Sequence, residues 1–203
     1  HYSRIALALD LRTGAASRFV NSTCNLMDAL IDLGQPDSAI ACVKSVGILE
    51  KLAPSFRSEL LGLLGRAYTL KNDHLQAVGY YQQALTLDRT SPVDEYHLMF
   101  HALFMGVGIR EASAEDLTAL GIPSGERYPR IIALLQESLA LARSAGYPRV
   151  QCDAMQELST THEAMGDTHA AWRDLRPSTF LKDRVLNAAN TRHGANRQDL
   201  DRP

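Results

Sequence analysis

The sequence predicts an all-α fold, a solenoid of stacked antiparallel helical hairpins with about four repeats and a further C-terminal helix. Residues 61–88 hold two helical patterns, at 61–70 and 74–87, joined by a short polar turn. A hairpin of this size cannot bury its apolar face alone. Related helical patterns return along the chain, and no strand-like alternation longer than a few residues separates them. We therefore expect hairpins stacked on both sides of residues 61–88.

Small and aromatic residues stand at fixed offsets in this central hairpin. We place Gly65 and Ala77 where the paired helices come closest, because a larger side chain would push their axes apart. The positions that define the repeat are Leu61, Leu64, Gly65, Tyr68, Ala77, Tyr81 and Ala84. This pattern resembles the tetratricopeptide repeat, and the resemblance implies a protein-binding scaffold of the α-solenoid class rather than an enzyme.

A comparison of the N-terminal and C-terminal parts of the sequence indicates the length of the repeat. Gly14 and Gly34 recur as Gly146 and Gly166, an offset of 132 residues that fits three units of about 44. In both copies we expect glycine to end a helix. The predicted units are a half repeat at 2–12, repeats at 16–52, 55–88, 93–145 and 149–176, and a terminal helix at 178–193, together one domain over 1–193 followed by a flexible tail at 194–203. Because the first unit is half a hairpin, we expect the chain to be an excised fragment.

The third repeat is irregular. Its helices are expected at 94–108 and 125–144, separated by an insertion at 109–124 that carries the helix-start signal Ser113-Ala-Glu-Asp. Insertions in repeat proteins often project from the functional face, and a packed surface loop is the alternative. Pro177 removes a helical hydrogen bond, so we expect a kink or break between the last repeat and the terminal helix.

Composition and charge favour a soluble, cytoplasmic protein. Of the 203 residues, 45% are hydrophobic and 22% charged, which is typical of a globular domain. The formal net charge of −2 gives no basic footprint, so we expect no contact with nucleic acid or with a membrane. Cys24, Cys42 and Cys152 are few and widely separated, as in a reducing compartment.

The sequence gives little support for catalysis or for a cofactor. His97 and His101 are four residues apart on one predicted helix, a spacing that can place two imidazoles on one metal. No Glu follows His97 as in the HExxH pattern, and no third ligand is near in sequence. We predict no catalytic residue, no metal and no cofactor. The histidines are expected to line a groove or to be hydrogen-bonded in the core, and an enzyme acting through them is the alternative that requires bound metal.

The sequence supports the binding of a ligand better than it supports catalysis. In stacked hairpins the first helices line one surface, and their non-core positions meet the ligand. Extrapolated from the central repeat, the groove positions are Asn21, Asn25, Asp28, Asp32, Glu59, Arg66, Thr69, Met99, Gln156, Thr160 and Glu163. This lining is polar and mildly acidic, so a cationic or amidated peptide suits it better than an acidic tail. The alternative is that several of these residues are merely solvated.

The C-terminal stretch at 164–193 resembles a particular group of proteins that contain tetratricopeptide repeats. It is similar to the last repeat of bacterial cytoplasmic sensor regions, in which an L-K-D-x-L-F-N pattern leads into an output domain such as a diguanylate cyclase, a histidine kinase or a helix-turn-helix regulator. The matching residues are Leu181, Lys182, Asp183, Leu186 and Asn187. The resemblance implies the sensory or regulatory region of a larger signalling protein, with a protein or peptide as ligand. The alternative is a dimerisation platform, and hence a homodimer, for an attached output domain.

Overall fold

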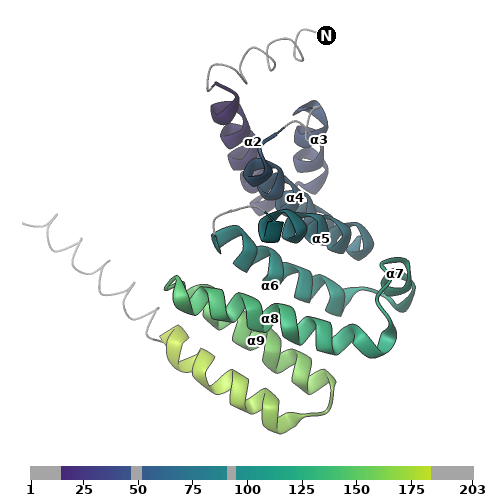
Figure 1. The fold of residues 1–203 in the computed structure, drawn as a ribbon, viewed down its shortest axis with the longest axis vertical. Helices are drawn as coiled ribbons and strands as arrows, with labels where there is room; N and C mark the ends of the chain where they lie inside the picture. Colours follow the sequence, from purple (N-terminus) through teal and green to yellow (C-terminus); the bar gives the residue numbers. More distant parts are fainter. Residues whose placement is uncertain (1–14, 47–51, 91–94, 184–203) are drawn as a thin grey trace, which may run out of the picture.

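The computed structural model describes residues 15–46, 52–90 and 95–183. The predicted half repeat at 2–12, the tail at 194–203 and most of the predicted terminal helix lie outside these residues. Within the described part the chain forms helices and turns without a strand, and the helices stack in chain order along the long axis of the molecule (Figure 1). The prediction of an all-α solenoid of helical hairpins is confirmed.

The helices pair as successive hairpins. Three pairs pack closely: α2 (Ala15–Asp32) with α3 (Pro36–Val46), α4 (Pro54–Leu70) with α5 (His74–Thr90), and α6 (Glu95–Glu111) with α8 (Arg127–Ser144). The fourth pair is α9 (Pro148–Ala164), which packs on α8, and a helix over residues 168–183, called the C-terminal helix below. The first helices α2, α4, α6 and α9 contact one another in that order. They therefore form one continuous row along the solenoid.

A left-handed glycine follows each of the helices α2, α8 and α9. Gly34, Gly146 and Gly166 have φ of +70°, +73° and +79°, a conformation that costs glycine little. At Gly34 the amide donates to the Ile31 carbonyl, and the next amide donates to Leu30, which is the double bond of a Schellman turn. The same pair of bonds recurs at Gly146 and Gly166. Three of the four glycines that predicted helix ends therefore stand at those ends, and Gly14 lies outside the described residues.

The core is continuous through the central hairpin. One buried cluster joins α2, α3 and α4, a second joins α5, α6, α8 and α9, and Tyr68 packs against both. Gly65 marks the closest approach inside the hairpin, because a Cβ there would lie 2.5 Å from Cε1 of Tyr81. The repeat-defining residues Leu61, Leu64, Gly65, Ala77, Tyr81 and Ala84 are buried, and Tyr68 is half-buried.

The insertion of the third repeat begins later than expected. Helix α6 continues to Glu111 instead of ending at residue 108, because Ile109 is fully buried in the second core cluster. The insertion then contains α7 (Ala114–Ala119) and the short 3₁₀ helix η2 (Ser124–Glu126). Ser113 caps α7 by accepting a hydrogen bond from the Asp116 amide, and the Asp116 carboxylate accepts one from the Ser113 amide. The helix start at Ser113 is therefore as the sequence predicts.

The helix break expected at Pro177 does not occur. Residues 168–183 are one continuous helix through the proline, so the last repeat does not end at 176 with a separate helix beginning at 178. Ser178 is buried, its hydroxyl donates to the Leu175 carbonyl, and its own carbonyl accepts from the Cys152 thiol on α9. We attribute the unbroken helix to this packing on α9, which offsets the hydrogen bond that the proline cannot donate.

Candidate functional site

A cavity of about 290 Å³ opens on the row of first helices, between α2, α4 and α6. Three successive repeats contribute to it. Its lining combines carboxylates, one guanidinium, two imidazoles and three aromatic rings, from Asp28, Glu59, Gly62, Leu63, Arg66, Tyr96, His97, Phe100, His101 and Phe104. We call it the first-helix cavity.

One end of the cavity is held by an ion-pair cluster. Arg66 on α4 pairs with Asp28 and, at 3.2 Å, with Asp32, both on α2. Its guanidinium carbon also lies 6.0 Å from the ring centroid of Phe104 on α6, within the range of a cation–π contact. Arg66 therefore links three helices and offsets one of the two negative charges of the paired aspartates on α2. These exposed ion pairs contribute more to geometry than to stability.

Glu59 lies about two helical turns before Arg66 on α4, next to a thiol of α2. The Cys24 thiol on α2 is hydrogen-bonded to its carboxylate. Burial, with the Glu59 charge as the next cause, raises the pKa of the Cys24 thiol to about 12. Cys24 is thus a neutral donor at physiological pH. Within the described parts of the chain no cation forms an ion pair with Glu59.

An aromatic row on α6 forms the opposite wall. Tyr96, Phe100 and Phe104 are four residues apart, so they share one face of the helix. Their ring centroids are 4.7 Å and 5.9 Å apart in sequence order. Tyr147 extends the row, with its ring 5.6 Å from that of Tyr96. The row gives the cavity a rigid apolar wall with ring faces for stacking.

His97 and His101 also line the cavity. Their rings are 6.0 Å apart and inclined by only 16°, so they stack instead of converging on one point. In the part of the chain that the structure describes, no group of three or more His, Cys, Asp or Glu side chains could hold a metal ion. His97 Nδ1 is buried with no hydrogen-bond partner among the described residues. The expectation of groove-lining histidines therefore agrees with the geometry.

A buried polar network anchors His101 beneath the cavity. His101 Nδ1 lies 2.7 Å from Asp88 Oδ2, and the other carboxylate oxygen of Asp88 accepts a hydrogen bond from the Ser58 hydroxyl. The Asp88 carboxylate lies between the Ser58 hydroxyl and the His101 imidazole. Ser58 therefore donates to the carboxylate and not to the imidazole. A hydrolytic triad needs its serine on the histidine, so this order does not prepare a nucleophile. The network fixes the imidazole plane.

Sequence reasoning missed this network because its members are far apart along the chain. Ser58 lies 30 residues from Asp88, and Asp88 lies 13 from His101. The one available signal is Gly62 on α4. A Cβ there would overlap the His101 ring, so the missing side chain makes room for the imidazole.

The predicted groove residues fall into four groups. Asp28, Glu59 and Arg66 line the first-helix cavity, and Asp32 reaches it through its ion pair with Arg66. Thr69 lies about one turn after Arg66 on α4, and its hydroxyl donates to the Gly65 carbonyl. The remaining polar positions lie outside the cavity lining: Asn21 and Asn25 on α2, and Gln156, Thr160 and Glu163 on α9. Met99 is wrongly placed by the prediction, because it is 0% exposed in the core.

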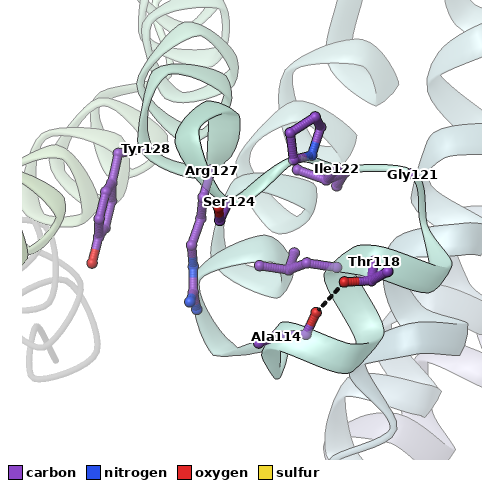
Figure 2. Close-up of a pocket in the computed structure, with 9 residues that line it drawn as sticks. Ala114, Thr118, Gly121, Ile122, Ser124, Arg127 and Tyr128 are labelled. Carbon is purple, nitrogen blue, oxygen red and sulfur yellow. Dashed lines mark hydrogen bonds between the residues drawn. The ribbon is translucent and has the colours of Figure 1, made fainter.

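The insertion forms a second cavity of about 550 Å³ between α7 and the start of α8. Figure 2 shows its lining, with the Thr118 hydroxyl donating to the Ala114 carbonyl. Arg127 donates to the carbonyls of Arg110 at 2.5 Å and of Ala112 at 3.0 Å. These carbonyls lie at the end of α6, so Arg127 Nη2 caps that helix. The buried Nε of Arg127 has no hydrogen-bond partner among the described residues.

Comparison with known proteins agrees with the repeat architecture. Residues 60–93 match the family model for the tetratricopeptide repeat. Two solved structures share the overall fold. One, "Crystal structure of MamA", has a TM-score of 0.56 at 16% identity and covers 90% of each chain. The other, "Crystal structure of MamA protein", has a TM-score of 0.54 at 16% identity over 90% of this chain and 84% of that one.

At 16% identity this likeness shows the fold alone. No curated protein sequence matches the chain. A solenoid of tetratricopeptide-like hairpins is typically a protein-interaction scaffold without enzymatic activity. Among the described helices none is long and apolar enough to cross a bilayer.

Proposed function

We propose that this chain binds a segment of another protein along the row of first helices, with the first-helix cavity as the anchor point. The observation that carries the proposal is a row of aromatic rings on α6, Tyr96 exposed and Phe100 and Phe104 half-buried, that lines one cavity together with carboxylates of α2 and α4. Aromatic side chains in a preformed cavity supply much of the binding energy of such interfaces. The cavity also lies where repeat solenoids present their ligand surface.

The polarity of the site favours a peptide over a small apolar ligand. The rings of Phe100 and Phe104 offer contact area, while Asp28 and Glu59 offer acceptors for donors of the ligand. An extended segment can use both because its side chains alternate in direction. The expected partner is a protein segment that carries donors, in keeping with the mildly acidic groove predicted from the sequence.

Selection from a random dodecapeptide library displayed on phage tests this proposal. Enriched peptides are synthesised with a fluorophore, and their dissociation constants are measured by anisotropy. Phe100→Ala removes one ring from the cavity and is expected to weaken binding about tenfold or more. Phe180→Ala is the matched control, because it removes an exposed ring of the C-terminal helix outside this cavity. Equal affinity of Phe100→Ala and the wild type would contradict the proposal, provided circular dichroism shows both folded.

We further propose that binding regulates an attached output domain. The support is the resemblance of residues 181–187 to the segment that precedes such domains, of which only 181–183 lie within the described structure. Leu181 packs against the core cluster shared by α6, α8 and α9, so a shift of these helices would reach that segment. In the full-length protein, addition of a selected peptide should change the output activity. An unchanged output at saturating peptide would end the regulatory part of the proposal.

Exposed apolar side chains favour a second candidate, a homodimerisation platform. Trp172 and Phe180, on the C-terminal helix, are 61% and 64% exposed. Large exposed rings on one terminal helix are a common feature of self-association surfaces. Light scattering across protein concentrations separates the two candidates. A strict monomer removes the dimer, whereas a dimer lost in Trp172→Ala supports it.

A further inference from the structure

Among the described residues, Glu59 is the carboxylate of the first-helix cavity that pairs with no cation. The two aspartates of α2 share Arg66, as described above, whereas within the same described residues Glu59 interacts with the neutral Cys24 thiol. A carboxylate has two oxygens and about four acceptor positions, so one thiol leaves most of them unused. Glu59 therefore retains most of its capacity to accept hydrogen bonds.

Aromatic side chains of α6 line the same cavity as this carboxylate of α4. Glu59 precedes Arg66 by two helical turns on α4, and Tyr96 and Phe100 precede Phe104 by two turns and one turn on α6. The two helices contact each other, and all five side chains line the same cavity. The Glu59 end thus has the same components as the Arg66 end, a carboxylate and aromatic rings lining one cavity, but without the guanidinium.

The Arg66 end of the cavity shows which chemical group can bind beside both a carboxylate and an aromatic ring. There a guanidinium pairs with carboxylates while its carbon lies 6.0 Å from the Phe104 centroid. A planar cation suits both walls, because guanidinium binds a carboxylate through its edge and an aromatic ring through its face. An anionic group at the other end would meet the Glu59 charge, and a purely apolar group would leave that carboxylate desolvated and unpaired.

We infer that the first-helix cavity is a subsite for one basic side chain of the partner, arginine in preference to lysine, bound between Glu59 and the rings of Tyr96 and Phe100. This inference rests on the proposed function and specifies it, because it names the side chain that anchors the bound segment. Lysine would gain the ion pair, but its compact ammonium lacks the planar stacking of guanidinium.

Two small probes of equal shape test the subsite directly. Nα-acetyl-arginine methylamide carries the cation, and Nα-acetyl-citrulline methylamide replaces guanidinium with a neutral urea. Each is titrated into the isotope-labelled protein and followed by NMR. The arginine probe should give saturable shifts in α4 and α6, with a dissociation constant at least tenfold lower than that of the citrulline probe. Glu59→Gln should remove this difference, because its amide keeps an acceptor for Cys24 but has no charge.

Glu163→Gln is the matched control, since it removes a charge from an exposed position on α9 outside the cavity. The control should retain the full difference between the probes. Equal binding of the two probes, no saturable binding of either, or an undiminished preference in Glu59→Gln would each overturn the inference. The dodecapeptide selection is read separately: peptides that depend on Phe100 but need no basic residue would leave the proposed function standing without this subsite.

Discussion

The packing of His101 under the cavity leads to a sharp prediction for Gly62→Ala. An ideal Cβ on Gly62 would lie 2.6 Å from Cδ2 and 3.0 Å from Cε1 of His101, and would overlap Nε2. The ring cannot turn away freely, because its Nδ1 is 2.7 Å from the Asp88 carboxylate and its side chain is buried. Either α4 moves away from α6, or the imidazole leaves its carboxylate.

Both outcomes destabilise the fold. Overpacking a core position by one methyl group costs about 1–3 kcal/mol. Releasing the imidazole instead loses a hydrogen bond to a charged group, about 1.5–3 kcal/mol. Replacing glycine with alanine inside a helix by itself stabilises the folded state by about 0.5–1 kcal/mol, which offsets part of this cost. We therefore expect Gly62→Ala to lower the free energy of unfolding by about 1–2 kcal/mol.

Gly79→Ala is the matched control, because Gly79 also lies inside a helix and a Cβ there meets nothing within 4 Å. It should raise the free energy of unfolding by about 0.5–1 kcal/mol. Urea denaturation followed by circular dichroism at 222 nm measures both changes. In a His101→Ala background, Gly62→Ala should no longer be costly. An equal cost in both backgrounds would refute the steric argument.

Two other predictions concern thiol reactivity and the insertion. Because burial raises the pKa of the Cys24 thiol from 9.0 to about 12, alkylation by iodoacetamide at pH 8 should label Cys24 at least about a hundredfold more slowly than Cys42. The folded state then holds this proton between pH 9.0 and about 12, so Cys24 lowers stability as pH rises through that window. Comparable labelling rates by mass spectrometry would contradict the burial. Arg127→Met removes the cap of α6 and should lower the free energy of unfolding by about 1–3 kcal/mol in urea, whereas Arg130→Met should change it little. Equal effects of the two arginine variants would show that the cap contributes nothing.

Local sequence signals were sufficient for the helices and their turns. Gly34 and Gly166 end helices because a left-handed residue is needed there, and glycine adopts that conformation at little cost. Ser113 begins α7 through a hydrogen-bond exchange that spans only three residues. The helix break predicted at Pro177 was wrong for the opposite reason. The effect of the proline depends on packing against α9, which no local pattern contains.

The site was predicted in part. Asp28, Glu59 and Arg66 could be placed on one surface because the central repeat indicates which positions of each first helix lie outside the core. Helix α6 is apolar on most sides, so helical periodicity could not distinguish its groove face from its core face. Met99 was therefore assigned to the groove, while Phe100, one residue later, lines the cavity.

The central claim is that a protein segment binds across α2, α4 and α6, and mapping the site of a selected dodecapeptide by NMR tests it most directly. The account predicts that the amides with the largest shifts cluster around Glu59, Gly62 and Phe100, and that the same amides show intermolecular contacts to the peptide. Shifts confined to the insertion cavity near Arg127, or to the exposed face around Phe180, would contradict it.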